Sequence, residues 1–169
     1  MTQTGVTRKI DELGRIVIPK EIRKNLGIRD GESLEIFTSE DSIILKKYYE
    51  VKRFEDVCDK LCEMINNIYD VNILITDREK VISSSMDNFK NKKLDKELIN
   101  LIDEREMLIS DKLLTKSIGN DEINGYYTVV PIVASSDSLG LVIIVDEAKT
   151  YERLAKLIAK IVVDKVDIF

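Results

Sequence analysis

The sequence contains no histidine and no tryptophan, and it has only two cysteines, Cys58 and Cys62, among 169 residues. The missing histidine removes the usual general base and the commonest metal ligand of proteins. The two cysteines are four residues apart, so in a helix they lie on one face, one turn apart. A zinc site needs further ligands, and none accompany them. We interpret both as small apolar residues of a core, with a disulfide between subunits as the alternative.

The sequence also lacks any apolar run near the ~18 residues that span a bilayer. The longest run, LGLVIIV at 139–145, has the length of a strand. The N-terminus lacks the apolar segment of a signal peptide. Composition is 44% apolar and 34% charged, an ordinary globular mixture, and the length allows one domain or two small ones. We therefore expect a cytoplasmic protein without a membrane partner.

Positive charge is concentrated near the N-terminus, although the whole chain has a net charge of −5. Residues 1–29 contain seven lysines and arginines against three acidic residues, a net charge of +4, which leaves −9 for the other 140 residues. A local cationic segment on an acidic protein predicts a nucleic-acid-binding module joined to another domain.

The first fifty residues predict four short strands and one short helix. Gly14 suits the tight turn between the first two strands, and Pro19 suits the first turn of the helix, which Gly27 would cap. Such a unit buries little apolar surface alone, and the consecutive apolar residues 16–18 need cover on both faces. We therefore expect a dimer whose strands interleave into one closed core. The expected strands cover residues 4–10, 15–18, 33–38 and 42–48, and the helix covers 20–26.

Residues 53–169 alternate between amphipathic helices and apolar strands. The pattern predicts an α+β domain with a mainly antiparallel sheet and helices on one or both faces. The first and last helices have wide apolar surfaces that could cover the sheet and also meet their copies in another subunit. Helices are expected at 53–69, 94–108 and 148–167, strands at 71–76, 81–85, 126–134 and 139–146, and a strand or irregular segment at 111–118.

Two segments resemble known families. TGVTRKIDELGRIVIPKEIRKNLGIRDGESLEIF, with IILKKY after it, resembles the DNA-binding domain of AbrB-type transition-state regulators over nearly all of residues 4–48. YYTVVPIVASSDSLGLVIIVD and the long helix after it are similar to the end of a GAF-like sensory domain of sporulation regulators. The domains expected from this are an AbrB-type DNA-binding domain at 1–50 and a GAF-like regulatory and oligomerisation domain at 53–169.

The resemblance implies a swapped-hairpin β-barrel for residues 1–50, in which two chains exchange hairpins, and further association through residues 53–169 into a tetramer. It implies double-stranded DNA as the partner, and a regulator that activates some late sporulation genes and represses others, on the nucleoid of the forespore. A small-molecule effector of the GAF-like domain is an analogy of fold only.

The resemblance also implies that arginines near the first loop and helix contact DNA, and Arg8, Arg15 and Arg23 match those positions. Lys24 stands where relatives often have arginine; it keeps the charge but loses the planar fork, which favours a phosphate contact. Strand alternation places Arg8 on the inward face, so Arg8 could pair with acidic loop residues while Lys9 contacts phosphate. The expected DNA-binding residues are Arg8, Lys9, Arg15, Arg23 and Lys24.

The second domain offers no catalytic constellation. Asp77, Asp146 and Glu147 are isolated carboxylates at strand ends, which we interpret as turn or cap residues, and Tyr126 and Tyr127 suit core packing better than a ligand pocket. No phosphate-binding loop or activated nucleophile is visible, so we expect no enzyme, cofactor or metal. Two alternatives remain: a ligand-sensing or protein-interaction module whose N-terminal domain mainly dimerises, and a swapped-hairpin antitoxin, against which the long folded C-terminal region argues.

Overall fold

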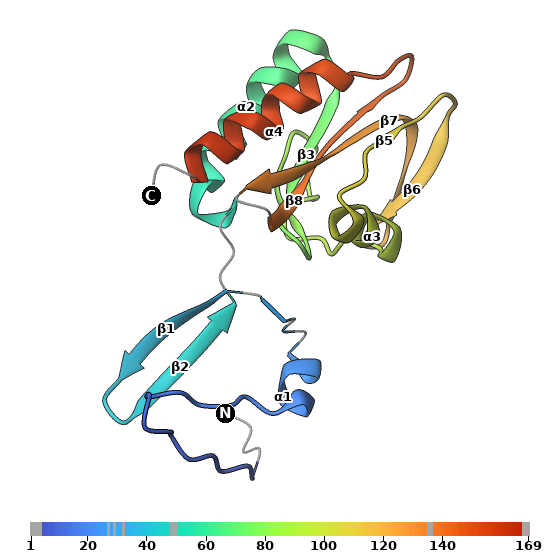
Figure 1. Cartoon of the computed structure of the whole chain (residues 1–169). Helices are drawn as coiled ribbons and strands as arrows, with labels where there is room; N and C mark the ends of the chain where they lie inside the picture. The colour runs from blue at the N-terminus through green and yellow to red at the C-terminus, as the bar shows by residue number, and fades with distance from the viewer. Residues whose placement is uncertain are drawn as a thin grey trace. The chain divides into compact units, whose positions relative to one another are not determined.

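The structure, a computed structural model, describes residues 5–26, 28, 30–31, 33–47, 51–134 and 137–166. The chain divides into two compact units, Met1–Tyr48 (unit 1) and Tyr49–Phe169 (unit 2) (Figure 1). Among the described residues, no helix is long and apolar enough to cross a membrane. The predicted cap at Gly27 lies outside the described residues.

Unit 1 contains one short helix and one hairpin. Helix α1 covers Lys20–Asn25, and strands β1 (Leu34–Ser39) and β2 (Ser42–Lys47) pair antiparallel. Pro19 directly precedes α1 as its N-cap, with φ −57°, and its carbonyl accepts a hydrogen bond from Arg23 N at 3.0 Å. The predicted helix and the second strand pair of this unit are therefore confirmed.

The first two predicted strands, at 4–10 and 15–18, do not form within the single chain. Residues 5–10 and 15–19 have no strand structure, although the expected turn between them exists. Asp11 N donates to the Arg15 carbonyl at 3.1 Å, and Gly14, with φ +75°, donates to the Asp11 carbonyl at 2.9 Å. An isolated two-stranded ribbon is marginal in water, which accounts for the lack of strand pairing between these segments within one chain.

Unit 1 has no buried residue among those described between 5 and 46. Its large apolar side chains are open to solvent: Ile10 is 62% exposed, Leu13 75%, Val17 74%, Ile36 67% and Ile43 64%. A unit that exposes most of its apolar side chains has not completed its core.

Unit 2 is built on a six-stranded sheet of order β4-β3-β8-β7-β5, with β6 also paired to β7. Every strand pairing in it is antiparallel. The elements of unit 2 are the 3₁₀ helix η1 (Val51–Phe54), α2 (Glu55–Tyr69), β3 (Asn72–Thr76), β4 (Val81–Ser84), α3 (Lys96–Glu104), β5 (Leu108–Ile109), β6 (Leu114–Ile118), β7 (Asp121–Ala134), β8 (Asp137–Asp146) and α4 (Glu152–Val166).

The sheet of unit 2 is apolar on both faces, and helices cover both (Figure 1). Ile73 and Ile144 point to the side of α2 and α4, while their neighbours Leu74 and Ile143 point to the side of α3. This alternation follows from the period of two along a strand. The predicted α+β class, with an antiparallel sheet and helices on both of its faces, is confirmed.

Two details of unit 2 bear on the sequence predictions. Helix α3 is shorter than the predicted 94–108, because Asp95 caps it by accepting from Leu98 N at 2.8 Å and Arg105, with φ +57°, ends it. Cys58 and Cys62 are buried in the core beside α4, as predicted. Burial raises the pKa of Cys58 to about 12 and that of Cys62 to about 11, which keeps both thiols protonated at neutral pH.

Candidate nucleic-acid interface

Arg15 lies at the end of the first turn of unit 1, held by Asp11. Its side chain is 71% exposed, and its Nε donates to Asp11 Oδ2 at 2.7 Å. The other carboxylate oxygen, Oδ1, accepts from the backbone N–H groups of Arg15 at 2.8 Å and Leu13 at 3.0 Å. The backbone and side-chain bonds from Arg15 lower the pKa of Asp11, so the carboxylate is charged at neutral pH.

Arg23 lies in the last turn of α1, followed by the exposed Lys24. The Nη1 atom of Arg23 pairs with Asp30, which lies in the turn between α1 and β1. The Arg23 side chain is 33% exposed, and its backbone carbonyl accepts from Ile28 N at 2.7 Å. The side chain of Arg23 is therefore less exposed than that of Arg15, and each is paired with one aspartate.

Arg8 and Lys9 are both exposed in the segment before the turn. Arg8 Nη1 donates to the neighbouring Thr7 carbonyl at 3.0 Å, and Asp11 is engaged by Arg15 instead. Val6 and Ile10, the neighbours that alternation places on the inward face, are also 41% and 62% exposed. This segment therefore has no inward face in the single chain. The expectation that strand alternation turns Arg8 inward does not apply to it.

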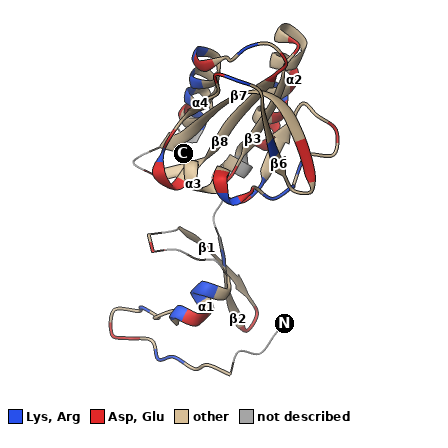
Figure 2. Ribbon diagram, turned by 90° about the vertical axis from the view of Figure 1, so that its right-hand side faces the viewer, with Lys and Arg blue, Asp and Glu red and all other residues tan. Residues whose placement is uncertain are grey.

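All five expected DNA-binding residues lie in unit 1, in the chain before α1 and on α1 itself, where Figure 2 shows basic residues. All except the half-buried Arg23 are exposed. Sequence reasoning missed the fixed roles of Asp11 and Asp30. The role of Asp11 could have been predicted from the sequence. An aspartate that begins a turn commonly accepts a hydrogen bond from the backbone N–H of the residue two positions later.

In unit 2 the carboxylates at strand ends organise turns, as the sequence predicted for Asp77 and Asp146. Asp77 Oδ1 accepts from Glu79 N at 2.7 Å and Lys80 N at 2.8 Å, and Asp146 Oδ1 accepts from two backbone N–H groups of the turn after β8. Tyr127 belongs to the core beneath α3, and its hydroxyl donates to the Ile123 carbonyl at 2.7 Å. Among the described residues, no group of three potential metal ligands occurs.

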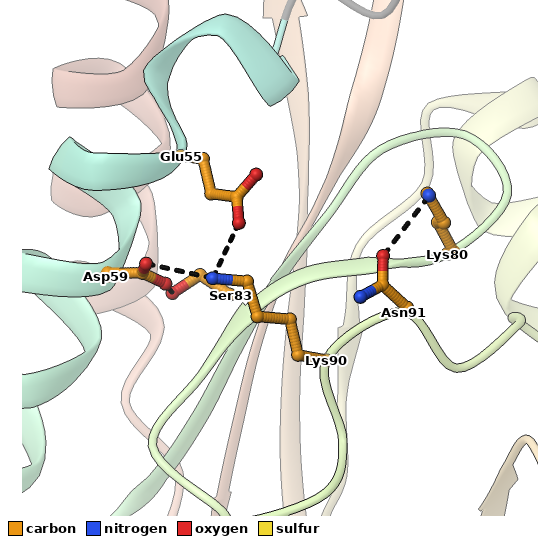
Figure 3. Close-up of polar contacts among 6 residues, drawn as sticks. All are labelled: Glu55, Asp59, Lys80, Ser83, Lys90 and Asn91. Carbon is orange, nitrogen blue, oxygen red and sulfur yellow. Dashed lines mark hydrogen bonds and ion pairs between the residues drawn. The ribbon is translucent and has the colours of Figure 1, made fainter.

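The loop between β4 and α3 is fastened to α2 (Figure 3). Lys90 Nζ lies 2.6 Å from Glu55 Oε1 and 3.0 Å from Asp59 Oδ2, and Ser83 Oγ donates to Asp59 Oδ1 at 2.6 Å. The two carboxylates raise the pKa of Lys90 to about 12. The following residues of the loop, 92–95, line an open cleft of about 370 Å³ together with residues 119–121 of the β6–β7 turn. Lys92 and Asp121 both line the cleft and pair with each other, so charges of both signs line it.

Both parts of the chain match known protein families. Residues 7–52 match the family described as antidote–toxin recognition MazE, bacterial antitoxin. Residues 53–164 match the family described as stage V sporulation protein T C-terminal, transcription factor.

The chain is also similar to individual proteins and to solved structures. Stage V sporulation protein T of Bacillus subtilis strain 168 is 37% identical over 156 residues, covering 89% of this chain and 88% of that protein. The solution structure of the N-domain of the transcription factor abrB is 56% identical over 28% of this chain and 92% of that one, with a TM-score of 0.27. The cofactor-binding GAF domain of the nutrient sensor CodY from Clostridium difficile is 18% identical, covers 66% of this chain and 83% of that one, and has a TM-score of 0.42. By the match of its larger domain and by identity along most of its length, the chain belongs to the stage V sporulation protein T family of transcription factors.

Proposed function

We propose that this chain is a DNA-binding transcriptional regulator of sporulation genes that acts on the forespore nucleoid, activating some genes and repressing others. The observation that carries the proposal is the alignment of both units, in the same order, with stage V sporulation protein T. The charge distribution supports it, because unit 1 carries the cationic segment and most of the expected contacts are exposed. Lysine and arginine neutralise phosphates and release counterions, which drives binding to duplex DNA.

Unit 1 binds DNA as a homodimer in which two chains exchange hairpins. The exposed apolar residues support this, since Ile36, Ile43 and Leu45 lie on one face of the β1–β2 hairpin at 67%, 64% and 43% exposure. A second copy that supplies strand neighbours for residues 5–19 and covers this face completes the core. Two sets of cations then lie along one duplex.

Unit 2 associates the dimers into a tetramer and senses a small-molecule effector. Exposed apolar residues on the outer surface of the helical layer support the association: Met64 is 51% exposed and Ile68 65% on α2, and Leu157 is 57% exposed on α4. The open cleft of about 370 Å³ beside α3 is the candidate place for an effector. The antitoxin alternative is less well supported, because residues 53–164 match a transcription factor family.

The experiment that tests the proposal is titration of the full chain against a fluorescent duplex of about three helical turns, followed by anisotropy. We expect saturable binding by the natural chain and a large loss for Arg15→Glu. Lys112→Glu makes the same charge change at an exposed position of unit 2 and serves as the control. Absence of duplex binding by the natural chain, or equal loss in both variants, contradicts the proposal.

A further inference from the structure

Asp11 is a carboxylate in the middle of the cationic segment, four residues before Arg15. On charge alone it should repel the phosphates that the neighbouring arginines and lysines attract, and its removal should tighten binding. Its two oxygens, however, make different contacts with the same loop, and both contacts involve Arg15.

The first oxygen, Oδ1, fixes the backbone of the turn. It accepts from Leu13 N at 3.0 Å and from Arg15 N at 2.8 Å, while two backbone bonds join Asp11 to Gly14 and Arg15. All these partners lie within residues 11–15 of one chain. The arrangement therefore does not depend on a second copy of unit 1.

The second oxygen, Oδ2, fixes the side chain of Arg15 by accepting from its Nε at 2.7 Å. A guanidinium has five N–H donors in a planar fork, and this bond uses the single donor on Nε. The four donors on the two terminal nitrogens remain for phosphate or base edges. Arg15 is 71% exposed, so without Asp11 it would have to give up rotamer freedom when it bound DNA.

We propose that Asp11 is a positioning residue for DNA binding, which orients the Arg15 guanidinium through Nε so that a carboxylate within the cationic segment strengthens the complex. The inference rests on the proposed DNA-binding function and adds to it a residue of the opposite charge. Glu12 offers the matched comparison, because it is an exposed carboxylate in the same turn.

The test compares duplex affinities of the full chain at one salt concentration for the natural chain, Asp11→Ala, Glu12→Ala, Arg15→Lys and the double variant Asp11→Ala/Arg15→Lys. We expect Asp11→Ala to weaken binding about fivefold or more, and Glu12→Ala to leave it equal or tighter. Lysine keeps the charge at position 15 but lacks the Nε edge and the planar fork. Asp11→Ala should therefore cause no loss in the Arg15→Lys background.

Two outcomes overturn the proposal: Asp11→Ala binding as tightly as Glu12→Ala, or a loss from Asp11→Ala that persists undiminished in the Arg15→Lys background. The latter would assign Asp11 a purely structural role. If circular dichroism shows that Asp11→Ala disturbs the fold, Asp11→Asn replaces it, because the amide oxygen still accepts from the two backbone N–H groups. Failure of the natural chain to bind any duplex would instead contradict the proposed function itself.

Discussion

At the scale of single residues, Arg15 and Arg23, two of the three arginines expected to contact DNA, differ in how they are held. Arg15 is bound to Asp11 through Nε and leaves its terminal nitrogens unused by that bond, whereas Arg23 is bound to Asp30 through the terminal nitrogen Nη1. A phosphate that approaches Arg23 in the same plane competes with Asp30. The Arg23–Asp30 pair is partly exposed and therefore weak enough to exchange for a phosphate, whereas Arg15 can keep its Nε bond to Asp11 while its terminal nitrogens bind DNA.

Arg15→Ala and Arg23→Ala are each expected to weaken duplex binding at least tenfold, because each removes one cation per chain and hence two per dimer. The far-ultraviolet circular dichroism spectrum should stay unchanged, since neither side chain belongs to a core. Anisotropy titrations of the two variants measure the effect. Lys112→Ala, which removes one exposed cation from unit 2, is the control. If either arginine variant binds duplex DNA at low salt as tightly as the natural chain does, that arginine is not part of the interface.

Asp77 gives a pH dependence of the stability of unit 2. It is 1% exposed, its Oδ2 has no hydrogen-bond partner, and burial raises its pKa above 3.8. The folded state therefore binds the proton more tightly than the unfolded state. The stabilisation from this group is complete below the unfolded pKa and is lost as pH rises through the folded pKa.

Asp77→Asn should consequently gain stability relative to the natural chain as pH rises from about 3.5 to 7. Urea unfolding at a series of pH values measures the difference in free energy of unfolding. Asp87→Asn, on the exposed loop after β4, is the control and should show no such trend. A difference between Asp77→Asn and the natural chain that is constant across this pH range would contradict the prediction.

At the scale of elements, the β1–β2 hairpin shows why pattern alone locates strands but not their neighbours. Its register pairs Ile36 with Leu45 and Thr38 with Ile43, which places three large apolar side chains on one face. All three are exposed within the single chain. The sequence predicted both strands of this hairpin. The first pair of predicted strands does not form within the single chain, and the proposed dimer would supply its neighbours.

Ile36→Asp should abolish dimer formation and DNA binding by the full chain, because it buries a carboxylate in the shared core. If unit 1 stayed a monomer, the same change would not disturb its fold, since Ile36 is 67% exposed in the single chain. Sedimentation velocity distinguishes the two expectations, with Glu35→Ala on the opposite face of β1 as the control. If the Ile36→Asp variant has the same oligomeric state as the natural chain, this face of the hairpin is not part of the dimer.

At the scale of the whole molecule, charge is divided between the two units, with the cationic segment confined to residues 1–29 of a chain whose net charge is −5. We therefore expect association with DNA to be driven by the small part of the surface that these residues form. The remaining acidic surface disfavours non-specific contact with nucleic acid.

The affinity for duplex DNA should fall steeply with salt. If the assembly neutralises roughly 6–8 phosphates, a plot of log K against log salt has a slope of about −5 to −7. Titrations at several potassium chloride concentrations measure it, and Arg15→Ala should make the slope shallower. A slope near zero would mean that phosphate contacts do not dominate binding.

The sequence by itself determined the division into a basic N-terminal and an acidic C-terminal part, the helix after Pro19, the α+β class and the family, because these depend on local composition, periodicity and motif. Only the tertiary structure decided the ends of α3, the fastening of Lys90 to α2 and the pairing of Arg15 with Asp11. These features depend on contacts between side chains whose distances no periodicity contains. The sequence already predicted that unit 1 does not close its own core, and the structure adds which of its apolar side chains remain exposed.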